Sequence, residues 1–241
     1  MQFFDNCLKI IQTLLPQRCL LCDGSSGNKP LCNDCLNDLP AHSKASCPIC
    51  ALPTFNAEIC GSCLQHPPAF DATIAAFNFV FPMDALLRAL KYRGELSVAE
   101  IAANGIINSL EYQLEHKTLP DLLIPMPLHP KRLQERGFNQ AMEISRRISR
   151  HIQRPLSTNS IMRMRHGEPQ ASLPLNKRAK NVKGVFAVSD AASNDLRGKH
   201  IAVIDDIMTS GASLNELAKT LKKAGAARVE CWVVARTLPH V

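Results

Sequence analysis

The sequence has no long apolar run, few aromatic residues and no P-loop motif. No stretch of about 18 or more uncharged apolar residues occurs, so no membrane-spanning helix is expected. With one Trp and two Tyr among 241 residues, stacking of nucleic-acid bases on aromatic side chains should contribute little to binding. A P-loop nucleoside triphosphatase would need a glycine-rich loop ending in Lys-Ser or Lys-Thr, and none is present.

The balance of charge is basic, and the rest of the composition is typical of a globular protein. The formal net charge of +7 favours anionic partners, and both phosphorylated metabolites and nucleic acid fit. The opening segment lacks the basic start of a secretion signal, and Asp5 and Lys9 interrupt its apolar run. We therefore expect an amphipathic helix over residues 1–18 that packs on the protein, and a cytoplasmic location.

Eight of the ten cysteines form four Cys-x-x-Cys pairs. Nine residues separate the first pair from the second and the third from the fourth, and each cysteine of the first set recurs 28 positions later. Two cysteines on a tight turn aim both sulfurs at one point, and two such pairs complete a tetrahedron around zinc. The repeat predicts a double zinc ribbon over 19–66 with two structural zinc ions, held by Cys19, Cys22, Cys32 and Cys35 and by Cys47, Cys50, Cys60 and Cys63.

Two alternatives to this arrangement remain open at the level of sequence. An even number of paired cysteines also fits a disulfide framework, although nothing in the sequence directs the chain to an oxidising compartment. The pairs can also be cross-braced, first with third and second with fourth, although a repeat favours two sequential, self-contained units. Of the two remaining cysteines, Cys7 has no assigned role, and Cys231 lies in an apolar run that predicts burial in a core.

Strand and helix signals alternate from about residue 70 onward. Strands are predicted over 72–80, 122–125, 201–204 and 229–234, and helices over 84–92, 98–116, 138–152 and 214–224. This alternation predicts an α/β domain over 70–241 with a mainly parallel sheet flanked by helices.

The stretch IAVIDDIMTSGAS, residues 201–213, carries the most chemical information. An apolar strand is followed by two acids, which we expect at the exposed tip of the strand. A turn of small residues comes next, and the start of a helix there offers backbone N–H groups and a positive dipole end to a phosphate. Gly211 should let a phosphate approach the backbone closely. The expected ribose-phosphate site comprises Asp205, Asp206, Thr209, Ser210, Gly211, Ala212 and Ser213.

These residues resemble the signature with which type I phosphoribosyltransferases bind phosphoribosyl pyrophosphate (PRPP). Two basic segments add to the resemblance. Residues 121–140 contain three prolines that should stiffen a loop after a strand, and Gly137 is expected to open a helix; residues 161–186 have the length of a lid. The candidate residues in these two segments are Pro127, Arg132, Arg136, Arg163, Arg165, Gln170, Arg178 and Asn181.

The order of these pieces along nearly the whole chain is similar to that of the ComF/GntX family of competence and DNA-uptake proteins. The pieces are the cysteine ladder, Leu90-Lys91-Tyr92, the proline-rich loop with RGFNQ, the basic lid segment and the PRPP motif. Gly167 departs from the family pattern, which often has Thr there. The resemblance implies a type I phosphoribosyltransferase core with a double zinc ribbon. It further implies that Asp205 and Asp206 contact the ribose, that 209–213 holds the 5-phosphate, and that Mg²⁺ accompanies PRPP.

Three hypotheses about function remain open. The chain is an enzyme that transfers phosphoribosyl to an unidentified acceptor, or a PRPP-responsive factor that contacts single-stranded DNA and the DNA-uptake machinery, or a structural adaptor held by zinc. The acid pair and phosphate turn argue against the adaptor, which would not need them. Nothing in the sequence identifies the acceptor.

Overall fold

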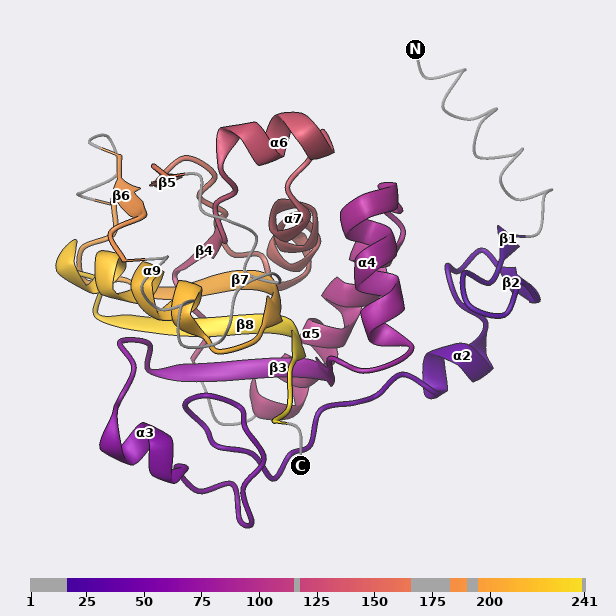
Figure 1. Cartoon of the computed structure of the whole chain (residues 1–241), viewed down its shortest axis with the longest axis horizontal. Helices are drawn as coiled ribbons and strands as arrows, with labels where there is room; N and C mark the ends of the chain where they lie inside the picture. The colour runs from indigo at the N-terminus through magenta and orange to yellow at the C-terminus, as the bar shows by residue number, and fades with distance from the viewer. Residues whose placement is uncertain (1–16, 115–117, 166–182, 190–194, 240–241) are drawn as a thin grey trace.

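The core of the protein is a four-stranded parallel sheet. A computed structural model describes residues 17–114, 118–165, 183–189 and 195–239. The strand order is β3-β8-β7-β4, and the three neighbouring pairs are all parallel (Figure 1). The strands are β3 (Ala72–Asn78), β4 (Leu122–Pro125), β7 (His200–Met208) and β8 (Arg228–Arg236). The predicted parallel sheet flanked by helices is confirmed.

Apolar clusters cover both faces of this sheet. Along β7, Ala202 and Ile204 belong to one cluster and Ile201 and Val203 to the other, as the alternation of side chains along a strand requires. The first cluster contains helices α4 (Met83–Arg93), α5 (Val98–Leu114) and α7 (Gln140–Ile152), and the second contains α9 (Ala212–Lys223). Cys231 is fully buried in the second cluster, as predicted.

Helix α6 (Pro130–Arg136) corrects the prediction of an irregular loop between β4 and α7. His129 caps it and Pro130 starts it, where the missing N–H of proline costs no hydrogen bond. Gly137, with a φ of 77°, ends α6 in the left-handed region instead of opening the next helix. Helix α7 begins only after Asn139, whose side chain accepts a hydrogen bond from the N–H of Ala141.

Strand β7 is longer than predicted, and this changes the setting of the two acids. Its pairing with β4 ends at Ile204, but its pairing with β8 continues to Met208, which is opposite Arg236. Asp205 and Asp206 therefore lie within a paired strand and not beyond its end. Asp206 is only 5% exposed, so the expectation of an exposed tip is wrong for this residue.

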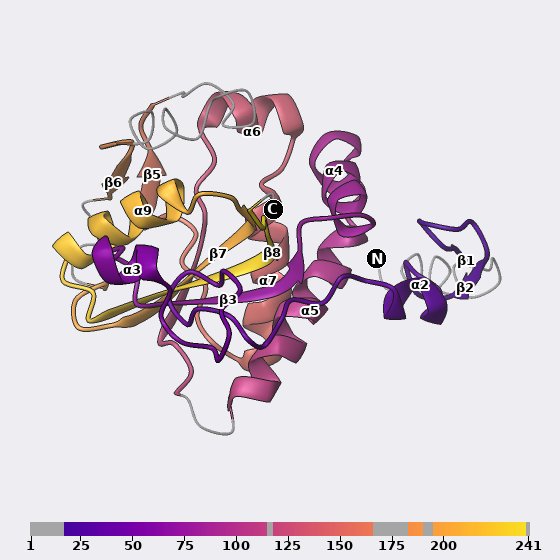
Figure 2. The same cartoon turned by 60° about the horizontal axis from the view of Figure 1, so that its bottom comes forward.

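The two cysteine repeats have different relations to the sheet. The first contains β1 (Gln17–Arg18), β2 (Ser25–Gly27) and α2 (Asn33–Asn37), and it lies at the periphery of the molecule in both views (Figures 1 and 2). The second contains α3 (Gly61–Gln65) and lies along the edge strand β3. There the N–H of Thr73 donates to Pro48 O at 3.0 Å and its hydroxyl donates to Ile49 O at 2.5 Å.

Two predicted segments fall partly outside the described residues. The helix predicted over 1–18 does so except for its last two residues, which form β1. The predicted lid has a described base, an antiparallel pair of β5 (Ile161–Arg163) and β6 (Phe186–Val188), while 166–182 lies outside. None of the helices in the described ranges is long and apolar enough to span a membrane.

We predict that Gly105→Ala destabilises the protein by about 1–3 kcal/mol, although alanine is the better helix former. A Cβ at Gly105 on α5 would lie 2.2 Å from the ring of Phe77 on β3, so the helix would have to move away from the sheet. Asn104→Ala is the matched control, because Asn104 is the exposed neighbour on the same helix. Urea unfolding of the three proteins measures the effect. Equal stability of the Gly105 variant and the wild type would contradict this packing.

Candidate functional site

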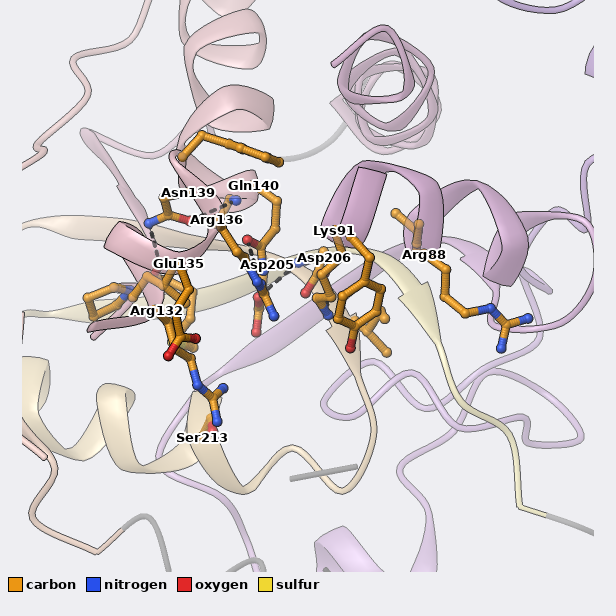
Figure 3. A pocket seen from close by; sticks show the side chains of 18 of the residues that line it. Arg88, Lys91, Arg132, Glu135, Arg136, Asn139, Gln140, Asp205, Asp206 and Ser213 are labelled. Carbon is orange, nitrogen blue, oxygen red and sulfur yellow. Dashed lines mark hydrogen bonds and ion pairs between the residues drawn. The ribbon is translucent and has the colours of Figure 1, made fainter. Parts of the chain in front are cut away.

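A cavity of about 1010 Å³ opens at the carboxyl ends of β4 and β7. Ligands of parallel α/β sheets bind at this edge, where loops follow the strands. Its charged lining residues are predominantly basic: Arg88, Lys91, Arg93, Arg132, Arg136 and Arg163 outnumber Glu135, Asp205 and Asp206, and seven of the nine are labelled in Figure 3. The cavity is therefore suited to an anionic ligand.

A buried ion pair between Lys91 and Asp206 lies in this cavity. Lys91 Nζ on α4 is 2.7 Å from Asp206 Oδ2 on β7 (Figure 3). Burial would lower the pKa of Lys91, but the charges of Asp206 and Asp205 outweigh it and raise that pKa. Burial would likewise raise the pKa of Asp206, and Lys91 instead holds it below the usual range. Asp206 is therefore ionised and Lys91 is charged.

The pKa of Asp205 is shifted in the opposite direction. Burial raises the pKa of its carboxyl well above the usual range, and the neighbouring charge of Asp206 adds to this. One Asp205 oxygen accepts a hydrogen bond from the N–H of Asp206 at 2.9 Å. The pKa values of the two adjacent acids are thus shifted in opposite directions, because only Asp206 forms an ion pair with Lys91.

The turn after β7 connects the acids to helix α9. Thr209 and Ser213 line the cavity, whereas Ser210, Gly211 and Ala212 belong to the turn but not to the lining. Gly211 has a φ of 75°, in the left-handed region that favours glycine, and a Cβ there would lie 2.8 Å from the side-chain methyl of Met208. The positive φ thus favours glycine here, and a side chain would also have to displace the flexible end of Met208. Close approach of a phosphate to Gly211 stays a prediction.

The helix α6 and the residues after it form the opposite wall. Asn139 Nδ2 donates to Met126 O at 3.1 Å, which ties the start of α7 to the segment after β4. Arg136 Nη1 donates to Gln140 Oε1 at 3.0 Å, and its guanidinium lies 5.6 Å from the centre of the Tyr92 ring. Arg136 is thereby held over the cavity beside α4.

The structure gathers part of the predicted set around this cavity. Thr209, Ser213 and both acids line it together with Pro127, Arg132, Arg136 and Arg163. Arg165 is exposed and is not a lining residue. Gln170, Arg178 and Asn181 lie outside the described residues.

Sequence reasoning did not assign Lys91, Arg88, Asn139 or Gln140 to the site. Lys91 had been noted only as part of a segment shared with a family. A lysine in a predicted helix far earlier in the chain gives no local sign of an acidic partner. The sequence signal for Asn139 was its preference for the N-cap position before a helix.

The eight paired cysteines form two compact clusters in the sequential arrangement. Within each cluster the four sulfurs lie within 4.8 Å of one another, and none of the nine described cysteines forms a disulfide. The clusters are Cys19, Cys22, Cys32 and Cys35, and Cys47, Cys50, Cys60 and Cys63.

The pKa shifts of these thiols fit a site for a divalent cation. Although burial works in the opposite direction, backbone N–H donors lower the pKa of Cys19 to about 6 and that of Cys47 to about 7. Contact with Cys32 raises the pKa of Cys35, and burial raises that of Cys63. Each cluster therefore ionises one thiol readily and resists ionising another. A bound Zn²⁺ lets four thiolates share one site.

Models of known families match both parts of the chain. Residues 10–64 match a double zinc ribbon domain and residues 134–238 match a phosphoribosyl transferase domain. Competence protein F of Haemophilus influenzae is 28% identical over 70% of this chain and 74% of its own length. DNA utilization protein YhgH of Escherichia coli strain K12 is 29% identical over 71% and 75%, and competence protein ComFC of Bacillus subtilis is 28% identical over 64% and 60%. The chain is thus similar to the ComF family in both of its parts.

Solved structures add little to this comparison. A purine phosphoribosyltransferase from Pyrococcus horikoshii is 19% identical with a TM-score of 0.34, over 57% of this chain and 82% of its own. A glutamine PRPP amidotransferase from B. subtilis is 16% identical with a TM-score of 0.34, over 56% of this chain and 26% of its own. These scores are too low to support an argument. The fold assignment rests on the sheet and on the family model.

We predict that metal analysis of protein purified under reducing conditions finds two zinc ions per chain. Cys32→Ser and Cys60→Ser occupy equivalent places in the repeat, and each should leave one zinc because each opens one cluster. The melting temperature should fall further for Cys60→Ser, since Thr73 of β3 donates two hydrogen bonds to the Cys47 to Cys50 turn of that cluster. Less than one zinc in the wild type would rule out this assignment and favour disulfides.

Proposed function

We propose that this chain binds PRPP, or a related ribose 5-phosphate ligand, together with Mg²⁺ in the cavity at the ends of β4 and β7. The observation that carries the proposal is the adjacency of three groups: an acid pair on β7, the Thr209 and Ser213 hydroxyls, and a wall of arginines. Each group suits one part of the ligand, namely the ribose hydroxyls, the 5-phosphate and the pyrophosphate.

The charge of the site supports a polyphosphate ligand over a neutral one. Asp206 is kept ionised by Lys91, so its carboxylate accepts hydrogen bonds from ribose hydroxyls. The start of α9 adds the positive end of a helix dipole beside Thr209 and Ser213. Arg132 and Arg136 on α6 lie across the cavity, where they would neutralise the pyrophosphate. Mg²⁺ reduces the remaining repulsion between phosphates.

If the chain is an enzyme, the reaction is transfer of phosphoribosyl to an acceptor with release of pyrophosphate. Positive charge develops at the anomeric carbon as the bond to pyrophosphate breaks, and the acid pair beside it stabilises this charge. The arginines of the opposite wall stabilise the leaving pyrophosphate. This scheme uses only groups that already line the cavity.

A second candidate function is that of a PRPP-responsive factor that contacts single-stranded DNA during DNA uptake. It is favoured by the names of the relatives, which are a competence protein and a DNA utilization protein. The net charge of +7 also suits a DNA backbone. Consumption of PRPP with a panel of bases, compared with DNA binding in its presence and absence, separates the two functions.

We predict that Asp205→Asn and Asp206→Asn both weaken binding of Mg-PRPP at least about tenfold, because each replaces a carboxyl oxygen that would accept a hydrogen bond from the ribose hydroxyls. Their effects on the stability of the ligand-free protein should have opposite signs. The raised pKa of Asp205 means that its ionisation opposes folding, so Asp205→Asn stabilises by on the order of 1 kcal/mol at neutral pH. Asp206→Asn leaves Lys91 buried without its partner and destabilises by about 3 kcal/mol.

Both stability differences should shrink as the pH is lowered. The pKa of Asp205 is raised in the folded protein, so Asp205 lowers the stability only as the pH rises above the ordinary carboxyl pKa. The pKa of Asp206 is lowered in the folded protein, so the stability that Asp206 contributes is lost as the pH falls through that lowered value. Calorimetric titration gives the affinities, and urea unfolding gives the stabilities. Wild-type affinity in both variants would overturn the proposed site, and stability changes of the same sign would overturn the assigned charge states.

We further predict weak binding of a labelled oligothymidine, independent of base sequence and strongly dependent on salt. Release of counterions makes the logarithm of the binding constant fall linearly with the logarithm of salt concentration. Fluorescence anisotropy over a salt series measures this slope, and oligoadenine is the control for sequence independence. An affinity that stays constant across the salt series would argue against a backbone contact.

A further inference from the structure

Arg236 is a buried arginine that belongs to none of the motifs seen in the sequence. It ends β8, opposite Met208 of β7, and is 4% exposed. Its Nε donates to Cys50 O at 2.8 Å. Its Nη1 donates to Met208 O at 3.0 Å, to Thr237 O at 2.9 Å and to Thr209 O. One guanidinium therefore connects the second cysteine cluster to the first residue of the phosphate turn.

A second, apolar connection lies beside this polar one. Cys47, Cys50 and Cys63 belong to the same buried cluster as Met208 and Phe70. The same two side chains lie beneath Gly211, where a Cβ would come within 2.8 Å of the Met208 methyl and 3.8 Å of the Phe70 ring. The second ribbon thus shares a buried apolar cluster with the side chains beneath the turn, in addition to the hydrogen bonds of Arg236.

We propose that Arg236 is a positioning residue that couples the metal state of the second cysteine cluster to the conformation of the turn at 209–213. With metal bound, the Cys47 to Cys50 knuckle is fixed and Cys50 O stays in place to accept from Arg236. Cys19 of the first cysteine cluster packs in the other apolar cluster, with residues of α4 and α5 and not with Met208, so the metal of the first cluster has no part in this coupling. The last step, from turn geometry to ligand affinity, rests on the proposed PRPP site.

The physical reason is the cost of an unpaired buried guanidinium. Loss of the metal removes the four bonds that tie the sulfurs of the second cluster together, so the Cys47 to Cys50 knuckle is held less firmly. If Cys50 O moves away, Arg236 loses its Nε acceptor in a buried place, and a buried donor without a partner is costly. The guanidinium then shifts and releases Met208 O and Thr209 O, the two carbonyls that it holds at the start of the turn.

The repeat supplies a matched pair of variants to test this coupling in the full chain. Cys60→Ser opens the second cluster, and Cys32→Ser makes the equivalent change in the first. We measure amide hydrogen exchange over 208–213 without ligand and the affinity for Mg-PRPP by calorimetry, well below each melting temperature. Cys60→Ser should speed exchange and weaken affinity about tenfold, a change of about 1.4 kcal/mol, and Cys32→Ser should change neither. Equal behaviour of the two variants would overturn the coupling.

Arg236→Lys tests the residue itself without touching a metal ligand. Lysine keeps the charge but lacks the fork that reaches Cys50 O and Thr209 O together. This variant should keep two zinc ions and still show faster exchange over 208–213. Combined with Cys60→Ser it should add little further effect, because the connection is already broken. A lower melting temperature with wild-type exchange over 208–213 and wild-type affinity would mean a purely structural role and would contradict the proposal.

The two proposals fail in different ways. If the wild type does not bind Mg-PRPP but exchange over 208–213 follows the second cluster, the proposed ligand is wrong and the coupling stands. If exchange does not respond, the coupling is wrong whatever the ligand. Should Cys60→Ser not fold, graded removal of zinc from the wild type with a chelator replaces it. Exchange at 208–213 must then rise with loss of the second zinc, and unchanged exchange overturns the coupling.

Discussion

The pairing of β7 with β8 beyond the end of β4 is the constraint on which the cavity and the second cysteine cluster both depend. It extends β7 to Met208, so that Asp205 and Asp206 are held in a strand with fixed side-chain directions. It also brings Arg236 opposite Met208, within reach of the turn and of the second cysteine cluster. The acid pair, the turn and the zinc knuckle are therefore positioned by one strand pair.

The charge states in the cavity follow from this placement. Two adjacent carboxyl groups in a buried strand cannot both ionise cheaply, and one cation from α4 reaches only Asp206. Asp205 keeps a raised pKa in the ligand-free protein, so ionisation of its carboxyl opposes folding. A destabilising buried group of this kind is expected where the demands of function and of stability conflict.

The sequence predicted the features that depend on neighbours in the chain. The cysteine spacing gave the two clusters, and the apolar runs gave all four strands of the sheet. Contacts between distant segments were not predictable in the same way, because nothing near Lys91 or Arg236 signals Asp206 or Cys50. The length of β7 was underestimated, since it depends on a partner strand that extends past Ile204. The helix α6 was missed for a different reason: Pro130 and Gly137 do mark its two ends, but they were interpreted as loop residues.

The asymmetry of the ribbons is a further result that the repeat concealed. The spacing of their cysteines is identical, yet only the second exchanges hydrogen bonds with Thr73 and Arg236 of the sheet. The central claim remains the ligand of the cavity, and hydrogen exchange of the wild type with and without Mg-PRPP tests it most directly. The account predicts that Mg-PRPP slows exchange across 205–214 and at the start of α7. Unchanged exchange in both segments at saturating Mg-PRPP would contradict it.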